Sequence, residues 1–241
     1  MKSESDQVCV VIPVLNEAEA IGRVVSAIPR GIVSEVVVVD GGSRDATAAV
    51  AEDAGARVVV ERRRGYGRAC ATGVVNSSAE VIVFLDGDGG DDSTKIPSII
   101  EPILHGEAEL VLGRRVSLES GSLPFYARVG NVVAALAISL IWRQPIHDLP
   151  SFKAIRRGDL VALGMTEATY GWTIELIVKA ARRRLRIREV PIAYHARIGG
   201  VSKVSGNLNA SVKAAVSILS VLARHAVGRG DIGVAGRIPL I

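Results

Sequence analysis

An unbroken apolar run that ends in a cluster of carboxylates constrains the fold of this chain more than any other feature. Residues 81–92 read Val-Ile-Val-Phe-Leu-Asp-Gly-Asp-Gly-Gly-Asp-Asp. An apolar run that is rich in β-branched residues and closed by glycine is typical of a central strand covered on both faces. Because open α/β sheets bind ligands at the carboxyl ends of their strands, we expect Asp86 and Asp88 to lie at a ligand site.

Two aspartates one residue apart also predict a cation site. Carboxylates confined together repel each other unless a cation neutralises them, and oxygen-only ligands favour a hard ion such as Mg²⁺ or Mn²⁺. We expect Asp86 and Asp88 to bind this ion, which would in turn hold phosphates, with Asp91 as a candidate third ligand. The alternative interpretation is a solvated acidic turn in which Gly87 and the neighbouring glycines serve the backbone geometry.

The rest of the first half alternates strands with helices. In addition to the strand that begins at residue 81, apolar runs predict strands at 8–14, 35–40, 57–61 and 109–113. Apolar residues at helical spacing fill the intervals. This alternation predicts an α/β fold with a doubly wound, mostly parallel central sheet flanked by helices.

Polar residues mark the expected starts of several helices. Asn16 is the expected N-cap after the first strand, Ser43 or Asp45 after the second, and Ser93 after the strand that begins at residue 81. The second half of the chain is less regular. There the pattern predicts strands at 151–155 and 186–195 and helices at about 126–142, 172–183 and 208–224.

The composition is that of one globular domain. The chain has 241 residues, of which 49% are hydrophobic and 22% charged. We expect a single domain over residues 1–227 and a flexible or partner-bound tail over 228–241. We find no secretory signal, and no apolar segment reaches the roughly 18–20 residues that span a bilayer. Cys9 and Cys70 fit reduced core thiols, so we expect a cytoplasmic protein.

Two clusters of arginines, within residues 62–68 and 182–188, point to an anionic ligand or partner. Phosphate-rich ligands, anionic lipid, nucleic acid or a solvated face would each account for them. Nucleic acid is the least suitable partner, because the carboxylate cluster would repel its phosphates. Next to the first cluster, Gly65-Tyr66-Gly67 opens a predicted helix, and Gly67 is a candidate for presenting a backbone N–H to phosphate.

Several short motifs together carry a family resemblance. They include Val-Ile-Pro-Val-Leu-Asn-Glu at 11–17, Val-Asp-Gly-Gly-Ser-Arg-Asp-Ala-Thr at 39–47 and Asp-Gly-Asp at 86–88. Gly-Arg-Arg at 113–115 and Asp-Leu-Pro-Ser-Phe-Lys at 148–153 follow in the same order. The chain resembles family 2 glycosyltransferases of the GT-A fold, and among them the polyprenyl-phosphate (dolichyl-phosphate type) sugar synthases, over about residues 7–225.

The resemblance implies a metal-dependent, inverting transfer of a sugar from a nucleotide-diphosphate sugar, with UDP as the favoured nucleotide. The first strand end would contact the base, and Asp40 would accept a hydrogen bond from a base ring N–H. The residues that the resemblance and the motifs assign to the donor are Pro13, Leu15, Glu17, Asp40, Gly67, Asp86, Gly87, Asp88, Ser202 and Lys203.

The acceptor that the resemblance implies is a polyprenyl phosphate at the inner face of a membrane. Arg115 and Arg128 would hold the acceptor phosphate, and Arg197 would contribute from a glycine-rich lid over residues 197–206. For a hydroxyl acceptor, Asp148 is the first choice of general base and Glu175 the second. For a phosphate acceptor, which is already deprotonated near neutral pH, Asp148 would position the acceptor instead.

Three alternatives stay open at this point. The acceptor could be a soluble hydroxyl compound, or the protein could bind nucleotide sugars without catalysis. The apolar helix at 129–142 could lie on the bilayer, pack on the sheet, or pair with a second copy of the chain as a homodimer. A sugar nucleotidyltransferase is disfavoured, because Leu-Asn-Glu-Ala at 15–18 replaces the glycine- and lysine-containing loop expected after the first strand.

Overall fold

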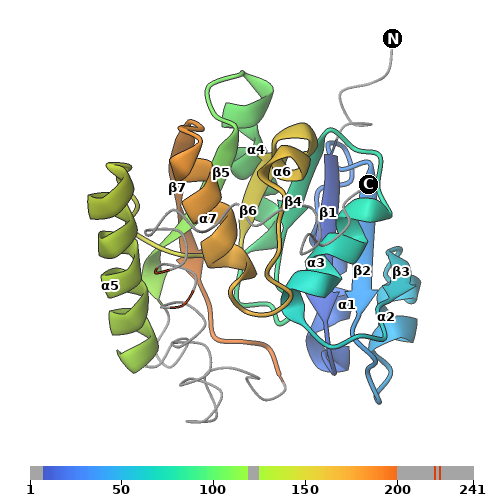
Figure 1. The fold of residues 1–241 in the computed structure, drawn as a ribbon. Coiled ribbons are helices and arrows are strands. Elements are labelled where there is room, and N and C mark those ends of the chain that lie inside the picture. Colours follow the sequence, from blue (N-terminus) through green and yellow to red (C-terminus); the bar gives the residue numbers. More distant parts are fainter. Residues whose placement is uncertain (1–7, 119–124, 200–219, 221–222, 224–241) are drawn as a thin grey trace.

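The central sheet of the computed structural model has the strand order β3-β2-β1-β4-β6-β5-β7, with helices on both faces (Figure 1). The structure describes residues 8–118, 125–199, 220 and 223. Its strands are β1 (Val8–Val14), β2 (Glu35–Asp40), β3 (Arg57–Val60), β4 (Val81–Phe84), β5 (Leu110–Leu118), β6 (Lys153–Arg156) and β7 (Ile187–Tyr194). Its helices are α1 (Ala18–Ser26), α2 (Thr47–Asp53), α3 (Tyr66–Val75), η2 (Ser93–Lys95), α4 (Ile96–Leu104), α5 (Phe125–Trp142), α6 (Arg157–Leu163) and α7 (Trp172–Arg182).

The parallel strands end together at one edge of the sheet. β1 pairs in parallel with β2 and with β4, and the register places Val14 beside Asp40. Asp86 follows β4 by two residues at the same edge. β6 runs antiparallel to both β4 and β5, and β5 is parallel to β7. The predicted mostly parallel sheet is confirmed, and its single reversed strand brings the start of β6 to the edge where β4 ends.

Side chains of alternate strand residues build a separate core on each face of the sheet, as the two-residue period of a strand requires. In β1, Cys9 and Val11 join the core that α3 and α7 cover, whereas Val10 and Ile12 join the core that α1 and α4 cover. These strand residues are fully buried, which explains why the strands are apolar without interruption. Cys9 and Cys70 are buried free thiols, as the sequence predicts.

None of the three predicted helix caps is the N-cap in the structure. The N-cap of α2 is Ala46 rather than Ser43 or Asp45, and the Asp45 carboxylate accepts from the Thr47 amide at 3.1 Å. Asn16 has a left-handed φ of 52°, and its side-chain oxygen accepts from the Arg44 amide at 2.8 Å, so it joins two loops rather than capping α1. Asp92, not Ser93, caps the turn before α4, because its carboxylate accepts from the Thr94 amide at 3.0 Å. Asn16 therefore fixes the loop after β1 to the loop after β2, beside the edge where the strands end.

The second half differs from prediction mainly in β5, which continues five residues beyond the predicted end at Gly113 to Leu118. The strand is longer because β7 continues to pair with it. Arg115 lies opposite Ile192, and the register shifts between Arg115 and Ser117. The short helix α6 was not predicted, and β6 begins at Lys153 rather than Ser151. Arg115 is therefore held on a strand.

Some expectations fall outside the part of the chain that the structure describes. These are the lid beyond residue 199, the tail over 228–241 and the last helix apart from Ser220 and Ala223. Among the described residues, no helix is both long enough and apolar enough to cross a membrane.

Candidate active site

Asp86, Asp88 and Asp91 form a carboxylate cluster in the loop after β4. Burial and the neighbouring charge of Asp88 raise the pKa of Asp86 to about 6. Burial and the charge of Asp86 raise the pKa of Asp91 to about 7. Both shifts reflect the cost of keeping negative charges together away from water, which a bound cation would relieve.

Asp91 carries the most direct indication of a ligand. It is buried, with 4% of its surface exposed, and its Oδ2 accepts from the Ser151 hydroxyl at 3.2 Å. Its Oδ1 is buried without a hydrogen-bond partner in the described part of the chain. Buried carboxylate oxygens are rarely left unpaired, so this atom fits a cation ligand.

The described side chains do not form a complete metal cage by themselves. No group of three or more His, Cys, Asp or Glu residues among them is spaced to hold an ion. This suits Mg²⁺ and Mn²⁺ at a phosphate site, because such ions are commonly held by one or two carboxylates together with water and substrate phosphates. The donor set, made only of carboxylate oxygens, fits a hard divalent cation.

Arg197, which follows β7, lies across this cluster. Its guanidinium is 3.4 Å from Oδ2 of Asp88 and 2.9 Å from Oε1 of Glu17. The Ile198 amide donates to the backbone oxygen of Asp88 at 3.0 Å. The structure therefore brings three of the predicted site residues, Glu17, Asp88 and Arg197, into direct contact.

The predicted base-binding residues surround the ends of β1 and β2. Asp40 is buried, and its Oδ1 accepts from the Gly42 amide at 3.1 Å and from the amide and hydroxyl of Ser43 at 2.8 and 2.7 Å. Pro13 lies near the end of β1, and Leu15, just beyond it, is 37% exposed. A base placed against Leu15 would meet Asp40 at the neighbouring strand end.

The two glycines assigned to the donor have packing reasons for being glycine. A Cβ on Gly67 would lie 2.3 Å from the backbone oxygen of Glu167, and one on Gly87 would lie 2.5 Å from Val14. In the same turn the Arg68 amide donates to the Ala168 oxygen at 3.1 Å. The start of α3 thus packs against the loop before α7, and this contact, rather than a phosphate, accounts for Gly67.

Arg115 and Asp148 form a buried ion pair, and this changes the role expected of Asp148. The Nε and Nη2 atoms of Arg115 donate to the two carboxylate oxygens at 2.8 and 2.7 Å, and its amide donates to Oδ2 at 3.0 Å. The Leu149 amide adds a fourth bond at 2.8 Å. A carboxylate that accepts four hydrogen bonds, two of them from a guanidinium, is poorly suited to remove a proton, so the structure argues against Asp148 as a general base.

The contacts of Glu175 also indicate a structural role. It is fully buried, its carboxylate accepts from the Thr166 and Glu167 amides, and it pairs with Lys179 at 2.8 Å. Burial alone would raise the pKa of Glu175, but hydrogen bonds from Lys179 and Thr166 lower it. The carboxylate fixes the loop before α7, which argues against the predicted second choice of base.

The remaining predicted residues lie apart from the cluster or outside the described residues. Arg128 is exposed on α5, and its side chain has no hydrogen bond to Arg115 or to the carboxylate cluster within the described ranges. Ser202 and Lys203 lie outside those ranges. Their predicted roles stay predictions.

Two residues of the site were missed from the sequence. Tyr66 stacks with Tyr170 at 6.5 Å, and its hydroxyl lies 3.5 Å from Asp86. Lys153 is fully buried and donates to the oxygens of Pro150 and Ser151 at 3.0 and 2.8 Å, and burial lowers its pKa to about 8. The signal for Lys153 was a charged residue at the start of a short strand, directly before the apolar residues Ala154 and Ile155.

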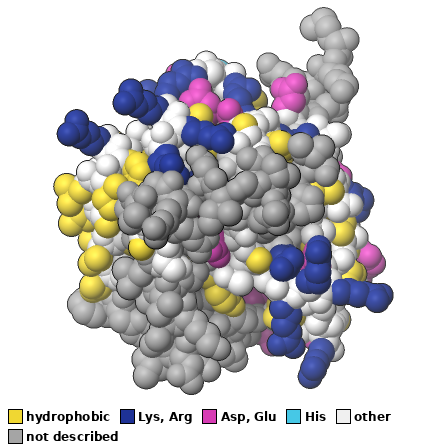
Figure 2. All heavy atoms as spheres, viewed as in Figure 1, with side chains coloured by type: hydrophobic (Ala, Val, Ile, Leu, Met, Phe, Trp, Pro, Cys, Tyr) yellow, Lys and Arg dark blue, Asp and Glu magenta, His cyan; other side chains and the backbone are white. Residues whose placement is uncertain are grey.

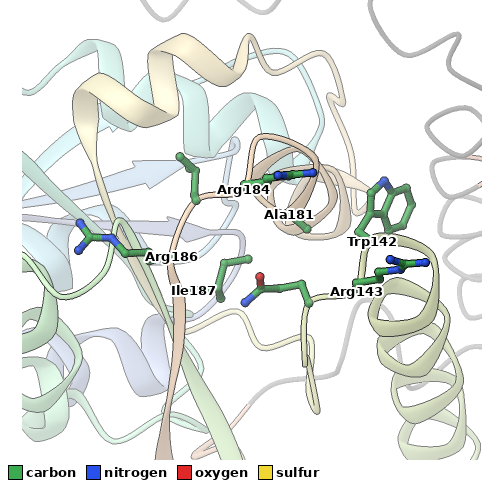
Figure 3. Close-up of a pocket in the computed structure, with 8 residues that line it drawn as sticks. Trp142, Arg143, Ala181, Arg184, Arg186 and Ile187 are labelled. Atoms are coloured by element: carbon green, nitrogen blue, oxygen red, sulfur yellow. The ribbon is translucent and has the colours of Figure 1, made fainter.

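A separate pocket of about 540 Å³ lies at the opposite edge of the sheet, between the ends of α5 and α7 and the start of β7. Trp142, Arg143 and Arg184 line it, and Figure 3 shows the Arg186 side chain directed away from Trp142 and Arg143. Arg186 is paired with Glu109. This basic pocket and the carboxylate cluster therefore lie at opposite edges of the sheet.

Comparison with known proteins gives consistent matches. The sequence profile of Glycosyl transferase family 2 matches residues 9–162. An uncharacterized glycosyltransferase of Mycobacterium tuberculosis is 39% identical over 217 residues, 90% of this chain and 98% of the relative. A dolichyl-phosphate hexose transferase of Haloferax volcanii is 34% identical over 197 residues, 80% of this chain and 85% of the relative. The crystal structure of glucosyl-3-phosphoglycerate synthase from Mycobacterium tuberculosis, in complex with Mn²⁺, UDP-glucose and phosphoglyceric acid, matches with a TM-score of 0.75 and 26% identity over 92% of this chain and 80% of that one.

Proposed function

Since the chain belongs to glycosyl transferase family 2 and has the GT-A fold, we propose that this glycosyltransferase moves a sugar, with inversion, from a UDP-sugar to a polyprenyl phosphate. The family and fold expected from the motifs are confirmed. The nucleotide, the metal and the acceptor are the parts that we propose.

The carboxylate cluster supports a metal-bound nucleotide donor. One or two carboxylates of the cluster formed by Asp86, Asp88 and Asp91 would hold Mg²⁺ or Mn²⁺ together with the donor phosphates, and the charge of the ion would stabilise the diphosphate leaving group. The observation that carries this assignment is the unpartnered Oδ1 of Asp91 beside two further carboxylates. The similar glucosyl-3-phosphoglycerate synthase was crystallised with Mn²⁺ and UDP-glucose.

The chain's own residues would orient the donor. Asp40 and Leu15 lie at neighbouring strand ends, where Asp40 can accept from a base N–H while Leu15 covers the ring. Arg197 is close enough to Asp88 to exchange that carboxylate for a diphosphate oxygen, to which a guanidinium donates strongly.

The pairing of Asp148 supports a phosphate acceptor. A hydroxyl acceptor requires a general base, and both predicted bases are engaged, Asp148 by Arg115 and Glu175 by Lys179. A phosphate monoester is already ionised near neutral pH and attacks without such help. Arg115, oriented by Asp148, would bind that phosphate.

The exposed face of α5 suits a lipid-linked acceptor. Val132, Val133 and Leu140 are 59%, 60% and 71% exposed, and Figure 2 shows hydrophobic side chains gathered over this helix with Lys and Arg side chains near one end. Trp142 ends the helix beside the arginine-lined pocket. An apolar stripe with an aromatic and basic end is typical of a helix that lies in a membrane interface.

A membrane-binding experiment tests this face. Binding to vesicles that contain anionic lipid should be lost in a Leu136→Glu, Leu140→Glu double variant and kept in Val60→Glu, which alters an equally exposed apolar residue on β3. Equal vesicle binding by both variants would contradict the role of α5. A change from dimer to monomer in the double variant would instead identify a contact between copies of the chain.

The second candidate is transfer to a small soluble phosphorylated acceptor. The structural similarity to glucosyl-3-phosphoglycerate synthase favours it, because Arg115 would serve any phosphorylated acceptor. Transfer from UDP-sugars with Mn²⁺ should be assayed with polyprenyl phosphate in detergent and with phosphoglycerate, and Asp88→Asn serves as the inactive control. Transfer to phosphoglycerate alone would replace the lipid acceptor, and no transfer from any nucleotide sugar would reject the donor proposal.

A further inference from the structure

Glu189, in the middle of β7, holds the turn that leads into β6. Its Oε1 accepts from the His147 and Asp148 amides at 2.8 and 3.3 Å, and its Oε2 lies 2.6 Å from Nδ1 of His147. The glutamate side chain is only 12% exposed, whereas the His147 side chain is 60% exposed. Glu189 thus accepts two hydrogen bonds from the backbone of the turn and also contacts the His147 side chain.

The same turn carries Asp148, which binds Arg115 through both oxygens. Residues 143–150 have no helix or strand of their own, so side-chain contacts must fix their shape. β5 and β7 pair in parallel with Glu189 opposite Leu112 and Ile192 opposite Arg115. Glu189 and Arg115 therefore lie three residues apart in register on adjacent strands, and the turn connects them.

Arg115 is held from a second side as well. Its guanidinium lies over the Tyr194 ring, 5.3 Å from the centroid, and Tyr194 bridges to Asp91 of the carboxylate cluster. Burial would lower the pKa of Arg115, but the hydrogen bonds and charge of Asp148 raise it. The guanidinium is thus fixed in direction and permanently charged next to the cluster.

We propose that Glu189 is a positioning residue which, by fixing the Asp148 amide, sets the direction in which Arg115 presents its guanidinium to the acceptor phosphate. This inference rests on the proposed function, in which Arg115 binds that phosphate. Glu189 itself touches no substrate. Its effect reaches the acceptor through the turn, Asp148 and Arg115 in sequence.

The inference predicts a graded series of variants. Glu189→Ala removes both acceptor oxygens from the turn and should raise the KM for the acceptor phosphate by roughly tenfold to a hundredfold, the scale of a misplaced binding group. Glu189→Gln keeps one carbonyl acceptor and should stay within about threefold of wild type. His147→Ala keeps both backbone donors and should resemble wild type, because a contact made by a mostly exposed side chain contributes little.

The donor side and a matched control separate positioning from general destabilisation. The KM for the nucleotide sugar should change by less than about threefold in every variant. The base-binding residues and the carboxylate cluster lie at the ends of β1 and β2 and in the loop after β4, and Arg197 lies beyond the end of β7, away from the turn that Glu189 holds. Glu101→Ala, an exposed glutamate on α4, should leave both KM values unchanged. If Glu189→Ala does not fold, Glu189→Leu keeps the side-chain volume while removing both oxygens.

A readout without substrate tests the contact itself. In protein labelled with ¹⁵N-arginine, the Nε–H resonance of Arg115, assigned from its loss in Arg115→Lys, should exchange slowly with water because Nε donates to Asp148 at 2.8 Å. Exchange should accelerate at least tenfold in Glu189→Ala and stay slow in Glu189→Gln and His147→Ala. Unchanged exchange, or an unchanged acceptor KM in an active enzyme, would overturn the inference. Wild-type protein that transfers no sugar would instead reject the proposed function, while the exchange measurement still tests Glu189.

Discussion

The guanidinium of Arg197 lies 3.4 Å from the carboxylate of Asp88, across the mouth of the proposed metal site. The same guanidinium also pairs with Glu17 at 2.9 Å. Arg197 thus provides a positive charge beside Asp88, and a divalent cation at the proposed site would compete with it for that carboxylate. Binding of a cation at the proposed site would therefore change the contacts of the described residues that follow β7.

Replacing Arg197 by methionine should separate cation binding from catalysis. Without the competing guanidinium, the affinity of the protein alone for Mn²⁺ should rise by roughly threefold to tenfold. Sugar transfer should nevertheless fall, because a donor to phosphate is lost. Titration calorimetry measures the first effect, and Arg188→Met, an exposed arginine on β7, is the control. Weaker Mn²⁺ binding by Arg197→Met would show that the two cations do not compete.

Asp91→Asn should stabilise the protein and impair its metal site. Burial raises the pKa of Asp91 to about 7, so at pH 8 the folded state carries an unfavourable buried charge that asparagine removes. The free energy of unfolding should increase by roughly 1–3 kcal/mol. The increase in melting temperature on adding Mn²⁺ should shrink in this variant and persist in Asp53→Asn on α2. An unchanged response to Mn²⁺ would remove Asp91 from the ligand set.

Cation affinity should depend steeply on pH. The pKa values of Asp86 and Asp91 are raised from 3.8 to about 6 and about 7, so protons compete with the cation as pH falls through this range. Affinity for Mn²⁺ should fall by roughly a hundredfold from about pH 8 to about pH 5.5 if both carboxylates bind the ion. Calorimetry in a series of buffers measures this, and a flat profile would contradict direct ligation by both.

The same two groups determine how stability changes with pH when no metal is added. Because their pKa values are higher in the folded than in the unfolded state, the folded state binds more protons between about pH 4 and 7. Their contribution to the free energy of unfolding should therefore be greatest at the acidic end and be lost as pH rises through 7. Asp86→Asn, Asp91→Asn double-variant protein should show a flatter profile in denaturant titrations.

Glu175→Gln should affect folding more than chemistry. Lys179 would be left buried without its counter-charge, and breaking such a pair typically costs about 3 kcal/mol of unfolding free energy. The kcat per folded molecule should change by less than about threefold, whereas loss of a general base costs roughly a hundredfold or more. Glu80→Gln, an exposed glutamate before β4, is the control for both measurements. A stable variant with kcat reduced a hundredfold would restore the catalytic interpretation.

Local patterns in the sequence were sufficient to predict the parallel half of the sheet and the position of the carboxylates. The apolar run at 81–85 has to be buried on both faces, and the residues after it necessarily lie at the sheet edge. The same pattern, an apolar run that ends on a carboxylate, predicted Asp40 at the end of β2, which is separated from β4 by β1. These inferences depend only on residues close together in the chain.

Contacts between distant segments decided the features that the sequence could not supply. Asn16 is a residue type that often caps helices, but its side-chain oxygen accepts a hydrogen bond from the amide of Arg44, 28 residues away. Asp148 has the chemistry of a base, but it is engaged by Arg115, 33 residues away. The periodicity of either segment does not determine which residue becomes the hydrogen-bond partner. That choice depends on the register of strands that meet only in the folded sheet.

The reversed direction of β6 divides the protein into two parts that could change independently. The residues that we propose to bind the donor lie at the carboxyl ends of β1, β2 and β4, whereas Asp148 and Ser151 lie in the turn before the amino end of β6. The hydrogen bond between Ser151 and Asp91 is a direct side-chain link across that division. Exchange of residues 143–152 between related enzymes is therefore a route to new acceptor preference on an unchanged nucleotide-sugar platform.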